Sequence, residues 1–320
     1  MLSSAIHLSS GYQMPLTGYG LWNVSKTTCA EQVYNAIKVG YRCFDGACDY
    51  GNEVEAGQGI ARAIRDGLVQ REELFITSKL WGTFHEPQHV QLSAHRQLSD
   101  WGLDYFDLYL IHFPVSLKYV DPSERYPPGW VSSDSKSVDL IQIPIHDTWR
   151  AMELLVDLKF TRSIGVSNFN IQLIRDILCY ARIAPAVLQI EHHPFLIQRQ
   201  LVDYVQGKGI TITAYCSFGP QSAVAAKPRK AALFTSLLEH NLIQEIAQLH
   251  GKTSSQVLLR WSTQRGIAVI PKSRRLLHMQ QNLDMKWELT SLEIDSISAL
   301  DQGLRFNDPV THGFNVPIFD

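Results

Sequence analysis

Asp45 and Tyr50 stand five positions apart, and both follow a short apolar run that ends at Phe44. Gly46 permits a sharp turn after that run, and we expect an amphipathic helix to begin near Asn52. This order places a carboxylate and a phenol at the carboxyl end of one predicted strand. In an α/β barrel the carboxyl ends of the strands carry the chemistry, so both groups are candidates for proton transfer.

Lys79 and His112 end two later apolar runs and are expected on the same rim. The ordinary pKa is about 10 for tyrosine and about 10.4 for lysine. A nearby ammonium favours the phenolate, so we expect Lys79 to lower the pKa of Tyr50, while Asp45 keeps Lys79 charged. His112 could hydrogen-bond a carbonyl oxygen and orient it. Together the four residues predict a proton donor for a developing alkoxide.

Each of these residues also has an ordinary structural explanation. Asp45 could cap the following helix, Tyr50 could be a half-buried aromatic, and His112 could be a satisfied core histidine. Lys79 is harder to explain in this way, because burying an unpaired ammonium is costly. The functional interpretation therefore depends on all four residues falling on one rim.

Strands and helices are predicted to alternate along the chain after an N-terminal β-hairpin made of Ala5–Leu8 and Gln13–Leu16. The predicted strands are Gly18–Trp22, Arg42–Asp45, Leu74–Lys79, Phe106–His112, Ser163–Val166, Val187–Glu191, Ile210–Tyr215 and Ile267–Ile270. The predicted helices are Thr28–Lys38, Val54–Leu68, Val90–Leu98, His146–Leu158, Gln172–Tyr180, Gln200–Gln206, Asn241–His250 and Leu277–Leu283, with extra helices late in the chain at Gln256–Arg265 and Leu292–Ala299. Eight such pairs predict an α/β protein with a (β/α)8 TIM barrel, formed as a single domain over residues 1–320.

No G-x-G-x-x-G follows the first predicted strand, which removes the fingerprint of an open dinucleotide-binding sheet. Two long insertions, Ser116–Pro144 and Phe218–Leu238, both follow predicted strands. We therefore expect both to overhang the rim that carries the candidate residues, where long loops usually determine specificity.

Composition narrows the class of protein further. A hydrophobic fraction of 45% and a charged fraction of 19% are typical of a globular enzyme, and the net charge of -2 gives no reason to expect nucleic acid or an anionic membrane as partner. No run approaches the roughly 18 apolar residues of a membrane span, and the first residues lack the basic start of a secretory signal. The five cysteines include no CxxC pair, which favours free thiols in a reducing cytoplasm; no metal site is expected.

A series of segments in chain order resembles the aldo-keto reductases. They are Phe44–Ala47, Tyr50–Glu53, Ser78–Trp81, Leu110–His112, Gly165–Phe169, Gln189–Glu191 and Ile270–Ser273. Within that family the chain is similar to the fungal aldopentose (D-xylose) reductases. The segments that carry this similarity are His112–Pro114, Tyr126–Gly129, Glu191–Pro194, Ser217–Pro220 and Gly303–Pro309.

The resemblance implies that NADPH lies extended across the carboxyl rim, with NADH possible but weaker. Tyr50 is then the general acid, Lys79 and Asp45 tune it, and His112 orients the carbonyl. Tyr215 would stack on the nicotinamide ring, although it could also be an ordinary barrel-end aromatic. The other implied cofactor contacts are Ser167, Asn168, Gln189, Ser217, Phe218, Gly219, Lys272, Ser273, Arg274, His278, Gln281 and Asn282.

The resemblance also implies a substrate, the open-chain aldehyde of an aldopentose, which would be reduced to the alditol. D-xylose would give xylitol and L-arabinose would give arabinitol, as steps of carbohydrate catabolism. The implied substrate contacts are Trp22, Asp49, Trp81, His112, Phe113 and Asn307. Three alternatives stay open: an aldehyde or aldose reductase with another main substrate, a Schiff-base aldolase with Lys79 as nucleophile, and a non-enzymatic cofactor-binding module. The resemblance does not fix the oligomeric state, since the family includes monomers and dimers, and a homodimer is our expectation.

The chain departs from the family pattern in the proposed phosphate site. Arg274 stands where an Asn or a small residue is usual, and His278 stands where an Arg is usual. A neutral His is a weaker phosphate partner than Arg, but Arg274 could replace that Arg. In the second insertion, Ala225 stands where the family often has an acidic residue that reaches the adenosine ribose. Basic residues lie nearby in the sequence, at Lys227, Arg229 and Lys230. This charge either favours NADPH or belongs to a solvated basic loop. Cys216 replaces a commoner Ser beside the pyrophosphate.

Overall fold

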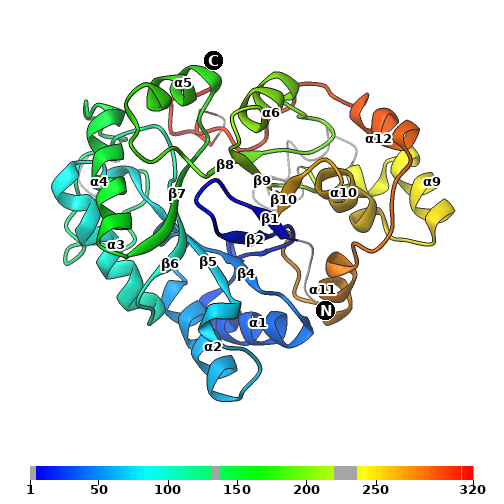
Figure 1. The fold of residues 1–320 in the computed structure, drawn as a ribbon, viewed down its shortest axis with the longest axis horizontal. Helices are drawn as coiled ribbons and strands as arrows, with labels where there is room; N and C mark the ends of the chain where they lie inside the picture. Colours follow the sequence, from blue (N-terminus) through cyan, green and yellow to red (C-terminus); the bar gives the residue numbers. More distant parts are fainter. Residues whose placement is uncertain (1–4, 132–136, 220–235, 311, 320) are drawn as a thin grey trace.

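Eight parallel strands close into a barrel at the centre of the molecule (Figure 1). The computed structural model describes residues 5–131, 137–219, 236–310 and 312–319. The strands are β3 (Tyr19–Gly20), β4 (Cys43–Asp45), β5 (Phe75–Leu80), β6 (Phe106–Ile111), β7 (Thr161–Ser167), β8 (Val187–Glu191), β9 (Thr211–Tyr215) and β10 (Ile267–Val269), and each pairs with the next. Hydrogen bonds of 2.8 Å, from Gly18 N to Val269 O and from Val269 N to Leu16 O, join the two ends of the sheet.

Helices surround the barrel and follow its strands (Figure 1). They are α1 (Lys26–Val39), α2 (Glu53–Arg65), α3 (Pro87–Trp101), α4 (Ile145–Asp157), α5 (Ile171–Tyr180), α6 (Arg199–Gln206), α9 (Asn241–His250), α10 (Ser254–Thr263), α11 (Leu276–Leu283) and α12 (Ser291–Ser298). Among the residues that the structure describes, no helix has the length and apolar character that crossing a bilayer requires.

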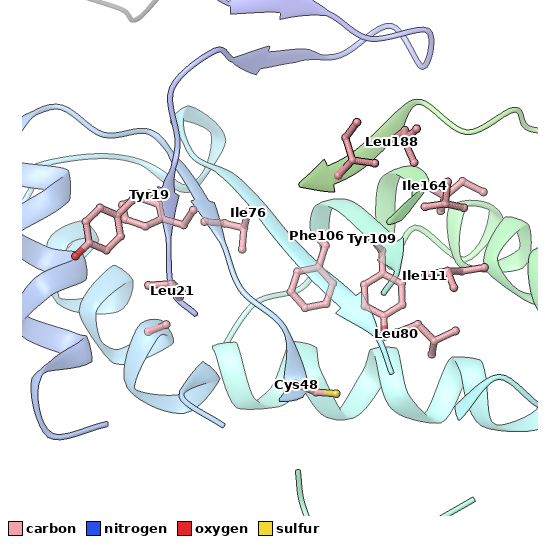
Figure 2. Packing of buried hydrophobic residues seen from close by; sticks show 14 of the residues in the cluster. Tyr19, Leu21, Cys48, Ile76, Leu80, Phe106, Tyr109, Ile111, Ile164 and Leu188 are labelled. Carbon is pink, nitrogen blue, oxygen red and sulfur yellow. The ribbon is translucent and has the colours of Figure 1, made fainter. Parts of the chain in front are cut away.

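Alternate residues of each strand face opposite layers of the core. Figure 2 shows Ile76 and Leu80 of β5 and Tyr109 of β6 in the large cluster that lies between the sheet and the helices. Leu108 and Leu110 of β6 belong instead to the cluster inside the barrel, near its amino end. The strands are thus buried on both faces, which explains why their sequences are nearly continuous apolar runs.

A hairpin of β1 (Ala5–His7) and β2 (Gln13–Pro15) closes the amino end of the barrel. Leu8 and Met14 from this hairpin pack against Phe75 and Val187, the first residues of β5 and β8. Because the amino end is filled, the opposite, carboxyl end is the one left for a cavity.

The predicted fold class, the hairpin and the order of the elements are confirmed, and most predicted ends lie within three residues of the observed ones. The first barrel strand is shorter than predicted, because the chain turns through Asn23, which has a φ of 58°. Helix α3 begins earlier than predicted because Pro87 occupies its first turn, where its missing N–H is not needed. Residues 220–235, which include Ala225, Lys227, Arg229 and Lys230, lie outside the described part of the chain.

Candidate active site

A cavity of about 680 Å³ opens at the carboxyl end of the barrel. This volume lies within the range of about 300–1,000 Å³ that is usual for small-molecule sites. The predicted site residues that line it are Trp22, Asp45, Asp49, Tyr50, His112, Phe113, Ser167, Asn168, Gln189, Tyr215, Ser217, Phe218, Gly219, Lys272, Arg274 and Asn307. They come from seven strand ends and the C-terminal segment, so the fold brings these residues together at one rim of the barrel.

Lys79 does not itself line this cavity, because it is fully buried behind Asp45 and Tyr50. Its Nζ donates to Asp45 Oδ1 at 2.6 Å, to Gly46 O at 2.8 Å and to the Tyr50 hydroxyl at 3.0 Å. Burial lowers the pKa of Lys79, and Asp45 opposes that change. An amine that is enclosed and bonded to three oxygens is poorly available as a nucleophile, which argues against the aldolase alternative.

Asp45 is the last residue of β4, and its second oxygen accepts a hydrogen bond from Gln189 Nε2 at 2.7 Å. The alternative that Asp45 caps helix α2 is wrong, because Asn52 is the N-cap residue of that helix. Gly46 does not have a positive φ. It is needed for space instead, since a Cβ there would lie 2.5 Å from Cζ2 of Trp101.

Tyr50 ends the 3-10 turn Cys48–Tyr50, and its ring meets that of His112 edge-on with the centroids 5.8 Å apart. Burial raises the pKa of Tyr50 well above its ordinary value, and Asp45 adds to the rise. The predicted lowering by Lys79 is therefore wrong in this structure. Burial disfavours the phenolate, and the negative charge of Asp45 offsets the field of the ammonium. Tyr50 thus remains a protonated donor at neutral pH.

His112 directly follows β6 and is 7% exposed. Burial lowers the pKa of His112 well below its ordinary value, and the positive charge of Lys79 adds to this, so the imidazole is neutral at neutral pH. Its Nδ1 is buried and finds no hydrogen-bond partner among the described residues. The side chain is therefore not an ordinary satisfied core histidine. A neutral imidazole can donate one N–H to a carbonyl oxygen.

Four polar residues form a connected wall beside this cluster. Ser167 Oγ donates to Gln189 O at 3.0 Å, and Asn168 Nδ2 donates to His112 O at 2.9 Å. The Tyr215 hydroxyl donates to Asn168 Oδ1 at 2.6 Å. Asn168 has a φ of 64°, a left-handed conformation that asparagine tolerates better than most residues. This wall presents amide and hydroxyl groups beside an aromatic ring.

The predicted phosphate residues are only partly gathered around the cavity. Lys272 and Arg274 line it, whereas Ser273 bonds within its own turn, its Oγ accepting from Arg275 N at 3.1 Å. The other predicted cofactor contacts in this part of the chain lie on helix α11 and do not line the cavity. His278 is exposed, Gln281 is half-buried and Asn282 is buried.

Of the predicted substrate residues, all except Trp81 line the cavity. Trp81 is buried, and its ring meets Phe113 edge-on at a centroid distance of 5.9 Å. Trp22 is 41% exposed at the mouth. Burial raises the pKa of Asp49 from 3.8 to about 6. Asn307 donates from Nδ2 to the Tyr215 hydroxyl at 3.1 Å.

Several lining residues were not predicted as site residues, and Trp130, His312 and Phe314 are among them. The Trp130 ring lies 5.0 Å from that of Trp81 and stacks on Phe314 with the centroids 5.2 Å apart. Trp130 directly follows the segment Tyr126–Gly129, so extending that segment by one residue would have found it. Phe314 comes from the irregular tail, where no periodicity indicates which side chains turn inward.

Comparisons with known proteins agree with this geometry. Residues 11–303 match the profile of the Aldo/keto reductase family. The chain is 59% identical over 320 residues to the probable NAD(P)H-dependent D-xylose reductase xyl1 of Aspergillus terreus, with all of both chains covered. It is 60% identical over 320 residues to the NAD(P)H-dependent D-xylose reductase xyl1 of Aspergillus niger, also over all of both chains. A probable enzyme of the same name from Arthroderma otae is 59% identical over 320 residues, covering all of this chain and 98% of that one.

Proposed function

The chain belongs to the aldo/keto reductase family, and we propose that it reduces the open-chain aldehyde of an aldopentose to the alditol with NAD(P)H. The observation that carries the proposal is the contact of the Tyr50 hydroxyl with the buried Lys79–Asp45 pair, beside a neutral His112 in a cavity. The names of the relatives from Aspergillus supply the substrate class.

In the proposed reaction the bound cofactor supplies a hydride, which adds to the carbonyl carbon of the sugar. Tyr50 donates its proton to the carbonyl oxygen as negative charge develops there, so the product is an alcohol. His112 donates a hydrogen bond to the same oxygen and orients it. Lys79 and Asp45 hold the Tyr50 hydroxyl in place.

The residues present suit nicotinamide adenine dinucleotide phosphate. The nearly buried wall of Ser167, Asn168 and Gln189 offers amide and hydroxyl groups for a carboxamide, and Tyr215 offers a ring for stacking. Lys272 brings positive charge to the same cavity.

Arg274 also lines that cavity, and basic residues suit a phosphate group. We therefore propose that NADPH is preferred and that NADH is used less well. His278, Gln281 and Asn282 are proposed as contacts of the adenosine half, while Ser273, Ser217, Phe218 and Gly219 border the phosphates.

For the sugar, we propose that Asp49 and Asn307 bind hydroxyl groups and that Trp22 and Phe113 wall the pocket. Trp81 supports Phe113 from behind. An apolar wall with a few placed polar groups fits an extended polyol aldehyde. D-xylose is the proposed main substrate. L-arabinose is a second one, because the two sugars differ only in their stereocentres.

Steady-state assays of purified protein with both sugars and both cofactors test the proposal. We expect NADPH-dependent reduction of D-xylose with a kcat/KM above that with NADH, and measurable reduction of L-arabinose. If the protein turned over a simple aldehyde but neither pentose, it would still be a reductase, but the proposed pentose substrate would be wrong. A higher kcat/KM with NADH than with NADPH would contradict the proposed phosphate site.

We also propose a cytoplasmic location and a role in pentose catabolism. The five cysteines are free thiols, which suits a reducing compartment. The chain is further proposed to act as one domain and to form a homodimer, which sedimentation velocity would test.

A further inference from the structure

Two segments that carry the family resemblance, Glu191–Pro194 and Gly303–Pro309, are bonded to each other. Glu191 ends β8 and is fully buried. Its Oε1 accepts a hydrogen bond from the amide nitrogen of Phe306, and its Oε2 accepts one from that of Asn307, both at 2.8 Å. One carboxylate therefore holds two consecutive peptide groups of the C-terminal segment.

The same connection is reinforced on both sides of the carboxylate. His193 Nε2 lies 2.9 Å from Glu191 Oε1, and Gln198 Nε2 donates to the Glu191 backbone carbonyl at 2.7 Å. Arg305 donates to Gln198 Oε1 at 3.1 Å. The Phe306 ring lies near that of His193, with the centroids 5.3 Å apart. Hydrogen bonds from N–H groups to an ionised carboxylate are stronger than neutral ones, so this is a firm anchor.

Glu191 does not line the cavity, but a chain of hydrogen bonds leads from its partner into the cavity wall. Asn307 Nδ2 donates to the Tyr215 hydroxyl at 3.1 Å, and that hydroxyl donates to Asn168 Oδ1 at 2.6 Å. Asn168 in turn donates to the backbone carbonyl of His112 at 2.9 Å. The placement of the Asn307 side chain thus depends on a backbone position that Glu191 fixes.

We propose that Glu191 is a positioning residue that sets the affinity for the sugar by holding the backbone of Asn307. The inference rests on the proposed role of Asn307 as a sugar contact. A carboxylate is required because it offers two acceptors side by side and no donor. A glutamine of the same shape would turn its NH2 group toward one of the two backbone N–H groups.

The variant Glu191→Gln tests this through two readouts. We expect the KM for the aldopentose to rise about tenfold, while kcat at saturating sugar and the Kd of NADPH change less than about threefold. In hydrogen–deuterium exchange, the amides of Phe306 and Asn307 should exchange faster than in the unmodified protein. Unchanged exchange at these amides, or equal rises in sugar KM and NADPH Kd, would overturn the proposal.

A double-mutant cycle shows whether Glu191 acts through Asn307. Asn307→Ala should raise the sugar KM by itself but add little in the Glu191→Gln background; full additivity would contradict the proposal. Glu153→Gln is a matched control, since Glu153 is also a buried carboxylate that accepts a backbone N–H, from Ile183 at 2.8 Å, in the α5–β8 connection. It should leave the sugar KM and the exchange at Phe306 unchanged.

If Glu191→Gln does not fold, Gln198→Ala replaces it. That variant removes only the bridge between Arg305 and the Glu191 carbonyl, and we expect a rise in sugar KM of about threefold with faster exchange at Phe306. No change in either quantity would count against the anchor. The exchange measurement does not require turnover. If the protein failed to reduce aldopentoses, the proposed function would be wrong, but hydrogen–deuterium exchange would still show whether Glu191 holds the backbone of Phe306 and Asn307.

Discussion

The Tyr50 hydroxyl lies 3.0 Å from an ammonium that is already paired with a carboxylate. Because Lys79 and Asp45 together are close to neutral, they orient the phenol without favouring the phenolate in the resting protein. Burial raises the pKa of Tyr50 further, so the proton stays on the oxygen until a stronger base appears. A developing alkoxide is such a base, so the Tyr50 hydroxyl gives up its proton only as the reduction proceeds.

Replacing Tyr50 with Phe keeps the ring and removes the proton donor. We expect kcat for aldopentose reduction to fall about 10³-fold, within the usual range for loss of a general acid, while the Kd of NADPH changes little. Single-turnover rates and fluorescence titration with NADPH measure the two quantities. Tyr180→Phe is the control, because the Tyr180 hydroxyl bonds Asp176 on the exterior of α5. If kcat of Tyr50→Phe were within tenfold of that of the unmodified protein, Tyr50 would not be the general acid.

Burial raises the pKa of Asp49, a proposed sugar contact, from 3.8 to about 6. The ionised carboxylate accepts hydrogen bonds from hydroxyl groups more strongly than the neutral acid does. The ionised form prevails above a pH of about 6, so the KM for the sugar should rise as the pH falls through that value. Asp49→Asn should abolish this dependence and keep the KM high. A sugar KM for the unmodified protein that stays flat between about pH 5 and about pH 8 would contradict the assignment.

Site residues at strand ends could be predicted, because each follows an apolar run that is readable in the sequence. Asp45, Lys79 and His112 are of this kind. Phe314 could not be, since the irregular tail lacks the periodicity that shows which side faces inward, and Trp130 could be found only through the neighbouring segment Tyr126–Gly129. The direction in which the Tyr50 pKa shifts could not be predicted from the sequence either, because the shift depends on how completely the surrounding elements exclude water.

At the scale of elements, helix α2 packs against the end of α3 through Gly57. A Cβ at Gly57 would lie 2.2 Å from the backbone oxygen of Trp101. The Trp101 indole donates to Glu53 at 2.7 Å and leaves no room for a side chain at Gly46. The turn that carries Tyr50 is therefore supported by the approach of two helices. Periodicity predicted both helices, but the distance between α2 and α3 is set by contacts that no local sequence pattern reveals.

Gly57→Ala tests this packing. Helix propensity alone predicts a gain of about 1 kcal/mol in the free energy of unfolding, but the added methyl group meets backbone. Overpacking of this kind costs about 1–3 kcal/mol, so we expect a net loss of about 2 kcal/mol or less in urea unfolding. Gly207→Ala is the control, since Gly207 ends α6 with a φ of -62° and should change the free energy by less than about 0.5 kcal/mol. A Gly57→Ala protein more stable than the original would show that the helices separate easily.

At the scale of the whole molecule, the first and last strands of the barrel meet along one seam. Gly18 N donates to Val269 O at 2.8 Å, and the Tyr19 hydroxyl donates to Ser273 O at 2.7 Å. At the rim, Lys272 donates to Trp22 O at 3.0 Å. Eight strand–helix pairs predicted a closed barrel, but the residues that join its ends are some 250 positions apart and only the folded chain identifies them. The proposed phosphate site lies on this seam, so we expect cofactor binding to be linked to closure of the barrel.

This linkage gives a prediction for the stability of the whole protein. A ligand that binds only the folded state stabilises it by about 2.7 kcal/mol at a concentration of 100 times its Kd. NADPH should therefore raise the Tm more than NADH at equal concentration, because Lys272 and Arg274 favour the extra phosphate. Lys272→Met should lower the Tm of the protein alone slightly, since the bond to Trp22 is lost, and should bring the shifts by the two cofactors close together. Lys208→Met, which alters a lysine beside Tyr204 on α6, should keep both shifts. A difference between NADPH and NADH that persists undiminished in Lys272→Met would place the phosphate away from the seam.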